Sequence, residues 1–210
     1  MTLSIDGLTD HDIAKTIDHS LLRPELDDAF VEDGCRLAAR YDVASVCVRP
    51  ADVLRARAIL AGTDVAVGTT IGFPHGNHLT AIKVFEAERA LVDGATELDM
   101  VIQIGALKAG RDADVGADIR AIVEVAHAGA AIVKVIFENA YLTDDEKIRA
   151  CHLTEAAGGV RTLDALLEVM ALGVTRVGAT ATAAIIDDFR ARKAGAGPVA
   201  AAAGSSEGGY

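Results

Sequence analysis

The amino-acid sequence predicts an α/β fold of the (β/α)8 TIM-barrel type, incomplete and with about six recognisable strands. Short runs rich in Val and Ile alternate with amphipathic stretches of roughly 10–15 residues, the pattern of parallel βα units whose strands are buried on both faces. Charged residues such as Asp18, Asp99 and Lys134 interrupt these runs near their C-terminal ends, where barrels carry catalytic groups. No Gly-rich dinucleotide fingerprint follows the first strand, so an open doubly wound sheet is the less favoured alternative.

The individual elements follow from the hydrophobic periodicity. We expect strands near residues 14–18, 44–48, 65–71, 97–102, 131–137 and 174–178. Amphipathic patterns predict helices at about 51–61, 80–92, 115–128, 143–157 and 181–193. The helix at 143–157 opens on Thr143-Asp144-Asp145-Glu146, a capping box in which the first and last side chains accept each other's backbone N–H.

The alternation of strand and helix breaks once. The helix from Thr143 to about Ala157 is followed by Gly158-Gly159-Val160-Arg161, and Thr162 opens another helix without a strand in between. A complete barrel takes about 250 residues, whereas this chain has 210. We therefore expect an internal loss at about 157–159, within one barrel domain over residues 1–193, and a flexible Ala/Gly-rich tail over 194–210 that ends in Tyr210.

Composition excludes several classes of function. The net charge is −11 and the sequence lacks the Lys/Arg cluster that a nucleic-acid binder needs. No apolar run reaches the roughly 18 residues of a membrane span, and the N-terminus has no secretion-signal pattern, so we expect a cytoplasmic protein. Cys35, Cys47 and Cys151 lack metal-ligand spacing and are expected to be reduced, mostly buried thiols. We expect neither a metal nor a cofactor.

The strongest catalytic candidates are one carboxylate and one lysine on neighbouring predicted strands. Glu97 and Asp99 share a face of their strand because side chains alternate. Lys134 interrupts the apolar strand at 131–137, although lysine is rarely buried. Asp99 and Lys134 are therefore either a general acid/base with an amine nucleophile, or an ion pair that stabilises the core.

Two Gly-rich turns are candidates for an anion site. Gly158, Gly159 and Arg161 precede one predicted helix, and Gly178, Ala179 and Thr180 join the last strand to another. Free N–H groups at helix N-termini favour phosphate, which in barrels commonly binds after the last two strands. The alternative is that both are ordinary turns.

Eight motifs together resemble the deoxyribose-phosphate aldolase family over residues 8 to about 186. They are IDHSLL (17–22), SVCVRP (45–50), GTTIGFPHG (68–76), KVFEA (83–87), ELDMVIQIGAL (97–107), VKVIFE (133–138), GGVRT (158–162) and RVGA (176–179). The resemblance implies a metal-free class I aldolase, a lyase of deoxyribonucleotide catabolism and carbohydrate degradation. It would convert 2-deoxy-D-ribose 5-phosphate to D-glyceraldehyde 3-phosphate and acetaldehyde through a Schiff base.

The resemblance also assigns roles to residues. It implies that Asp99 relays protons and that Lys134 lines the site. Asp18, Cys47, Gly158, Gly159, Arg161, Gly178, Ala179 and Thr180 would bind the substrate and its phosphate. The partner is thus a small sugar phosphate, and a homodimer is possible for this family. Tyr210 would assist proton transfer from the tail.

The chain departs from the family at one place, where the sixth- and seventh-strand segment with the Schiff-base lysine is missing. Three interpretations follow. The chain is an aldolase by descent with impaired activity, or an inactive relative that binds sugar phosphate or oligomerises, or a shortened chain that does not fold stably alone. If any carbonyl chemistry survives, Lys134 is the expected nucleophile, because it alone sits within a predicted strand and can face the barrel interior, whereas the other lysines fall near element ends, in loops or on helices.

Overall fold

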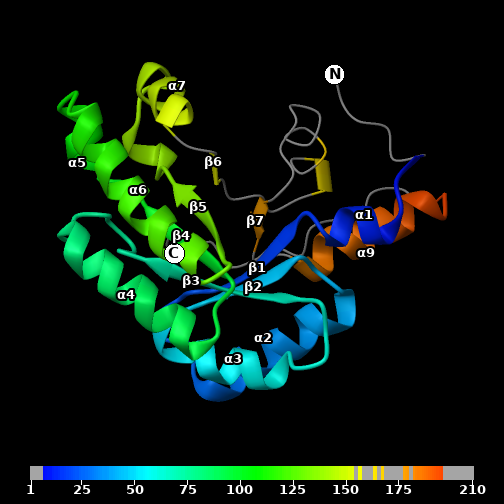
Figure 1. Ribbon diagram of the computed structural model, residues 1–210. Coiled ribbons are helices and arrows are strands. Elements are labelled where there is room, and N and C mark those ends of the chain that lie inside the picture. The colour runs from blue at the N-terminus through cyan, green and yellow to red at the C-terminus, as the bar shows by residue number, and fades with distance from the viewer. Residues whose placement is uncertain are drawn as a thin grey trace. The chain divides into compact units, whose positions relative to one another are not determined.

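The computed structural model describes residues 7–153, 156–157, 163–164, 167, 177–179 and 182–195 (Figure 1). The chain divides into two compact units. Described residues of the first unit fall within Met1–Val46, Ile59–Val65 and Gly159–Tyr210, and those of the second within Cys47–Ala58 and Ala66–Gly158. One barrel domain over 1–193 and a flexible tail over 194–210 stay predictions.

The elements are strands and helices in alternation, as predicted. The first unit contains α1 (Asp10–Ala14), β1 (Ile17–Leu21), α2 (Asp28–Tyr41), β7 (Val177–Ala179) and α9 (Thr182–Lys193). Both β2 (Ser45–Val48) and α3 (Val53–Ile59) contribute residues to each unit. The second unit contains η2 (Pro50–Asp52), β3 (Ala66–Ile71), α4 (Thr80–Asp93), β4 (Glu97–Val101), α5 (Ile104–Lys108), α6 (Asp112–Ala128), β5 (Ile132–Ile136), η3 (Asn139–Tyr141), α7 (Asp144–Leu153) and β6 (Ala156–Ala157). Within the described ranges, none of the helices has the length and hydropathy that a bilayer-crossing segment requires.

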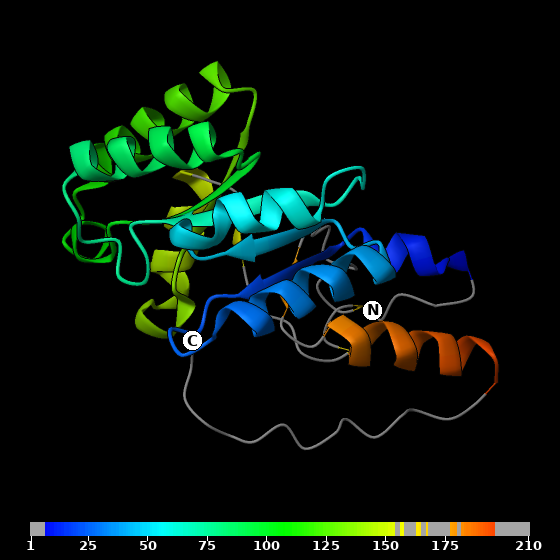
Figure 2. The same cartoon turned by 90° about the horizontal axis from the view of Figure 1, so that it is seen from below.

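In the first unit, β1 and β7 pair in parallel, and α1 and α9 lie side by side (Figure 2). The strand register places Asp18 opposite Gly178. Apolar side chains fill the interior, with Ile17 of β1, Val31 of α2 and Phe189 of α9 fully buried. This burial, rather than the short strand pairing, holds the three helices to β1.

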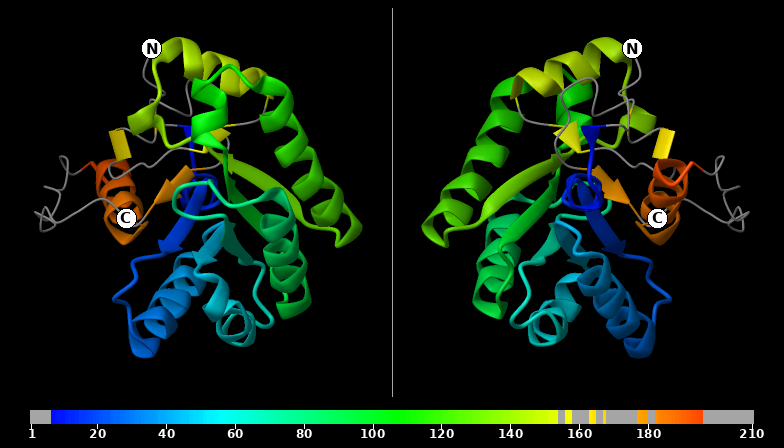
Figure 3. Two further views of the ribbon diagram at one scale, coloured as in Figure 1. Left: turned by 90° about the vertical axis from the view of Figure 1, so that its left-hand side faces the viewer. Right: turned by 90° about the vertical axis from the view of Figure 1, so that its right-hand side faces the viewer.

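In the second unit, β3, β4, β5 and β6 pair in parallel, each with the next in the chain. The helices α4 and α6 pack on one another, and α6 runs along β5 (Figure 3). Leu98 and Met100 of β4 and Ile122 of α6 are fully buried. All five residues of β4 are buried, and that Leu98 and Met100 face the covering helices stays a prediction from the alternation of side chains.

The first predicted strand is displaced. We expected it at 14–18, but it runs from Ile17 to Leu21 because residues 10–14 form α1. The hydroxyl of Thr9 accepts a hydrogen bond from Asp12 N–H, and the Asp12 carboxylate accepts one from Thr9 N–H at 2.8 Å. This capping box fixes a helix ahead of the strand.

The expected absence of a strand between the helix that begins at Thr143 and the helix predicted from Thr162 is wrong. The helix α7 ends at Leu153, not near Ala157, and Ala156–Ala157 pairs in parallel with β5 as β6. The predicted capping box of α7 is confirmed, since Thr143 N–H donates to Glu146 Oε2 at 2.8 Å and Glu146 N–H donates to Thr143 Oγ1 at 3.3 Å. Alanine favours a helix by its intrinsic propensity, and pairing with the open edge of β5 overrides that preference here.

A buried lysine ties the second unit together. Lys83 of α4 is 0% exposed, and its Nζ donates to Asp118 Oδ2 of α6 at 2.6 Å and to the Val101 carbonyl of β4 at 2.9 Å. Thr80 Oγ1 donates to the other Asp118 oxygen at 2.7 Å. One ammonium group thus joins two helices to the C-terminal end of a strand.

Lys83→Met is expected to lower the free energy of unfolding by about 3–5 kcal/mol, because Asp118 then stays buried without its cation. Lys83→Met with Asp118→Leu removes both charges and is expected to cost less than the single substitution. Urea unfolding followed by circular dichroism measures both. Lys147→Met, which removes a solvent-accessible ion pair with Asp144 on α7, is the control and should change stability by no more than about 0.5 kcal/mol. Equal costs for the single and double variants would contradict the expectation.

Candidate active site

The second unit brings Asp99 and Lys134 together. They are register partners on β4 and β5, and Lys134 Nζ lies 2.9 Å from Asp99 Oδ1. The same Nζ lies 3.1 Å from Glu97 Oε2. The predicted adjacency of Asp99 and Lys134 is confirmed, and Glu97 joins them as a third member. Two carboxylates beside one amine stabilise its charged ammonium form.

Lys134 is less buried than Lys83. Its side chain is 14% exposed, whereas that of Lys83 is 0% exposed. Asp99 and Glu97 are themselves buried. A group of charges with one partly accessible member suits chemistry on a small molecule better than the sealed Lys83–Asp118 pair does.

The first unit contains two buried polar pairs around β1. Ser45 Oγ donates to Asp18 Oδ1 at 2.6 Å, so the predicted site residue Asp18 is tied to β2. His19 Nδ1 lies 2.8 Å from Thr182 Oγ1 at the start of α9. Burial lowers the pKa of the His19 imidazole to about 4, so the ring is neutral near pH 7.

The remaining predicted site residues are placed in part. Cys47 is a buried thiol of β2, as predicted, and so is Cys35 of α2. Gly178 and Ala179 lie in β7, where they pair with Asp18 and His19. The predictions on Gly158, Gly159, Arg161, Thr180 and Tyr210 lie outside the described residues. Among the residues that are described, no three His, Cys, Asp or Glu side chains gather closely enough to hold a metal ion.

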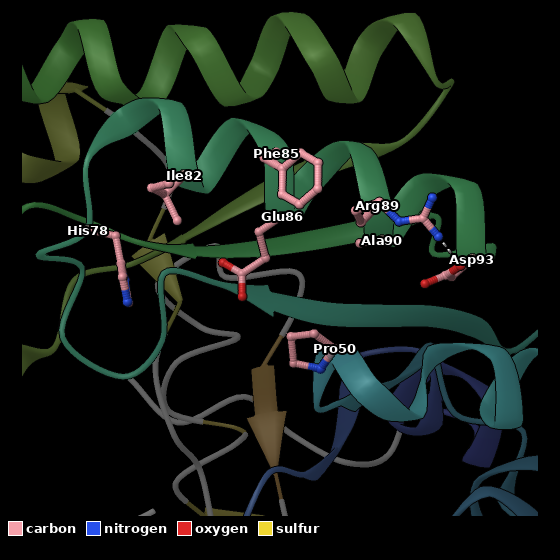
Figure 4. Close-up of a pocket in the computed structure, with 8 residues that line it drawn as sticks. All are labelled: Pro50, His78, Ile82, Phe85, Glu86, Arg89, Ala90 and Asp93. Carbon is pink, nitrogen blue, oxygen red and sulfur yellow. Dashed lines mark hydrogen bonds and ion pairs between the residues drawn. The ribbon is translucent and has the colours of Figure 1, made fainter.

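A different part of the second unit carries a cavity of about 270 Å³ (Figure 4). It is lined by Pro50, His78, Ile82, Phe85, Glu86, Arg89, Ala90 and Asp93. Arg89 is paired with Asp93 at 3.0 Å, and Glu86 points away from α4 toward the side where Pro50 lies. An anion here would meet the carboxylates of Glu86 and Asp93, and the Arg89 guanidinium is already paired with Asp93. This cavity therefore does not suit a phosphate.

The loop after β3 is held by α4. Gly72 N–H donates to Glu86 Oε2 at 2.7 Å, and Gly72 has φ +66°, which favours glycine. A Cβ at Gly72 would lie 2.7 Å from Lys83 Cε, and one at Gly76 would lie 2.0 Å from the Ile102 carbonyl oxygen. The motif at 68–76 thus serves close packing at the ends of β3 and β4.

Sequence reasoning missed three of these groups. It placed Lys83 among helix residues without recognising its burial, it did not pair Glu97 with Lys134, and it passed over His19. The small residues Ala87 and Ala90, four and seven positions after Lys83, were the available signal, because they mark the buried face of α4.

Comparison with known proteins decides the family. Residues 10–186 match the family described as DeoC/LacD family aldolase. The chain belongs to this aldolase family. It is 42% identical to the deoxyribose-phosphate aldolase of Rhodopirellula baltica over 217 aligned residues, which cover 86% of this chain and 90% of that protein.

Solved structures of relatives share the fold of this chain. A candidate deoxyribose-phosphate aldolase from Coccidioides immitis is similar with a TM-score of 0.81 and 33% identity over 87% of each chain. The deoxyribose phosphate aldolase of Aeropyrum pernix, described as a tetramer, has a TM-score of 0.74 and 25% identity, covering 88% of this chain and 93% of that one. The predicted fold class, a parallel α/β barrel type, is confirmed.

The alignment with the Rhodopirellula relative is longer than the part of this chain that it covers. It spans 217 residues, whereas 86% of the 210 residues of this chain is about 181, which leaves about 36 positions of the relative without a counterpart here. For the other relatives aligned over more than 200 residues, the alignment likewise exceeds the part of this chain that it covers, and we call this excess the surplus segment.

The buried His19 predicts a loss of stability in mild acid. An unfolded histidine titrates near pH 6.5, whereas the folded one titrates near pH 4. Between these values the unfolded chain binds a proton that the folded chain does not, so stability present above pH 6.5 is lost as the pH falls toward 4. The full effect is about 3 kcal/mol.

Urea unfolding at several pH values between 7 and 5 measures this loss. His19→Gln is expected to flatten the decline, whereas the control His127→Gln, at an exposed position of α6, should keep it. A decline of the same steepness in His19→Gln would refute the assignment.

Proposed function

We propose that this chain is a deoxyribose-phosphate aldolase by descent, and that its substrate class is 2-deoxy-D-ribose 5-phosphate. The family match over residues 10–186 carries this proposal. The reaction would yield D-glyceraldehyde 3-phosphate and acetaldehyde, in the cytoplasm and without a cofactor. Asp99 is the proposed proton relay, since it lies beside a partly accessible amine on the adjoining strand.

We propose further that catalysis is impaired because the family's Schiff-base lysine has no counterpart in this chain. The surplus of about 36 aligned residues in the Rhodopirellula relative supports a lost segment, which we place at about 157–159. A class I aldolase needs an amine that is uncharged near neutral pH. Lys134 is held by Glu97 and Asp99 in the charged form, so it is a poor substitute.

Residual carbonyl chemistry would fall to Lys134. Its amine would attack the C1 aldehyde of the open-chain sugar and release water to give an iminium ion. Asp99 would take the proton of the C3 hydroxyl while the C2–C3 bond breaks, and the bond electrons would form an enamine. Protonation of the enamine and hydrolysis would return acetaldehyde and free Lys134.

Substrate binding is proposed for residues that the family resemblance assigns to it. These residues are Asp18, Cys47, Gly158, Gly159, Arg161, Gly178, Ala179 and Thr180. Asp18 and Gly178 are register partners on β1 and β7, which supports a common binding site for these two residues. An inactive relative that still binds sugar phosphate is the alternative.

Turnover of 2-deoxy-D-ribose 5-phosphate is expected to be at least about 1,000-fold below that of the Rhodopirellula relative, because the covalent step lacks its activated amine. Both proteins are assayed side by side for glyceraldehyde 3-phosphate release. Inserting the relative's surplus segment after Ala157 should raise the rate. Turnover within tenfold of the relative would show the impairment to be wrong.

Borohydride trapping with acetaldehyde separates a weak aldolase from an inactive relative. Label on Lys134, lost in Lys134→Ala and kept in the control Lys147→Ala, is expected for the weak aldolase. Label confined to exposed lysines would favour the inactive relative.

We also propose a homodimer formed through α4. Leu79, next to α4, and Ile82, Phe85 and Val92 on it are large apolar side chains that are more than half exposed. In a two-fold symmetric dimer the stripe of one copy would cover the same stripe of the other, which removes both apolar surfaces from water. The Aeropyrum pernix relative is described as an oligomer.

Ile82→Asp with Phe85→Asp is expected to weaken self-association at least about tenfold, because two buried apolar contacts become charged. Sedimentation equilibrium measures it. Ile148→Asp, at an exposed apolar position on α7, is the control and should leave association unchanged. A monomeric unsubstituted chain at high concentration would rule out the dimer.

A further inference from the structure

Glu97 is a buried carboxylate whose position on β4 brings it to Lys134. It begins the strand, two residues before Asp99, so both side chains share one face. Asp99 is the register partner of Lys134, whereas Glu97 is opposite Ile132, one pleat nearer the N-terminal end of the strands. The Lys134 Nζ nevertheless reaches both carboxylates, at 3.1 Å and 2.9 Å.

This geometry fixes where the amine lies. Asp99 is the register partner of Lys134, and contact with Glu97 lies toward the N-terminal ends of the strands, away from the ends where barrels carry out their chemistry. Contact with Glu97 holds Nζ between the two carboxylates. A second negative charge at ion-pair distance also favours the ammonium form over the neutral amine.

We propose that Glu97 is a positioning residue that keeps Lys134 charged and withdrawn, and so limits its reaction with aldehydes. This inference rests on the proposed function in taking Lys134 as the amine that meets an aldehyde. Glu97 acts through Lys134 and need not touch the substrate. Neutralising Glu97 therefore makes Lys134 more reactive.

Reductive labelling of the full chain tests this without requiring turnover of a sugar phosphate. The lysine amine attacks acetaldehyde, the carbonyl oxygen leaves as water, and cyanoborohydride delivers hydride to the iminium carbon to give N-ethyl-lysine. Peptide mapping then yields the ratio of label on Lys134 to label on Lys147, a lysine of α7 whose side chain is 37% exposed. Lys83 is fully buried and stays unlabelled while the second unit is folded.

The ratio is expected to rise at least about tenfold in Glu97→Gln, because one of the two carboxylates that stabilise the ammonium form is neutralised. Glu97→Asp keeps the charge, but its side chain is one methylene shorter, which moves the carboxylate away from Lys134. This variant should raise the ratio by a smaller factor. Glu124→Gln, at an exposed position of α6, is the matched control and should leave it unchanged.

An unchanged ratio in both Glu97 variants would overturn the inference. If Glu97→Gln exposes Lys83 to label, that variant has unfolded and Glu97→Asp decides the matter. A failure of the proposed aldolase activity appears separately, as absent release of glyceraldehyde 3-phosphate, and does not change the ratio.

Discussion

The arrangement of the second unit depends on the buried ammonium group of Lys83. An unpaired charge at a position that is 0% exposed would be very costly, so Asp118 and the Val101 carbonyl must stay in place. Because these partners lie on α6 and at the end of β4, one side chain sets the position of two helices against a strand. The small residues Ala87 and Ala90 let α4 approach closely enough for this contact.

Because β4 is fixed in this way, its side chains determine which groups surround Lys134 on the neighbouring strand β5. The parallel register places Lys134 opposite Asp99, and the alternation of β4 adds Glu97 on the same face. The two lysines of the second unit thus use the same ion-pair chemistry with different results. Lys83 is sealed and structural, whereas Lys134 is partly accessible and lies beside Asp99, the residue proposed as proton relay. Its two carboxylates favour charge over nucleophilicity, which accords with an aldolase by descent whose catalysis is impaired.

The residues that α4 exposes to solvent follow from the residues that it buries. Lys83, Ala87 and Ala90 occupy the buried face, so the large apolar residues Ile82 and Phe85 are turned outward. The usual pattern of an amphipathic helix is reversed over this stretch. The reversal explains why an apolar stripe and a cavity unsuited to phosphate lie on α4, apart from the charged group on β4 and β5.

The sequence by itself determined the elements whose signals are local. Strands near 44–48, 65–71, 97–102 and 131–137 and the Thr143 capping box follow from periodicity and side-chain chemistry within a few residues. The adjacency of Asp99 and Lys134 was also predictable, because parallel βα units place successive strands side by side. Only the tertiary structure decided the burial of Lys83, the contact of Glu97 with Lys134 and the strand at Ala156–Ala157, since each depends on a partner distant in the sequence or on an unpaired strand edge.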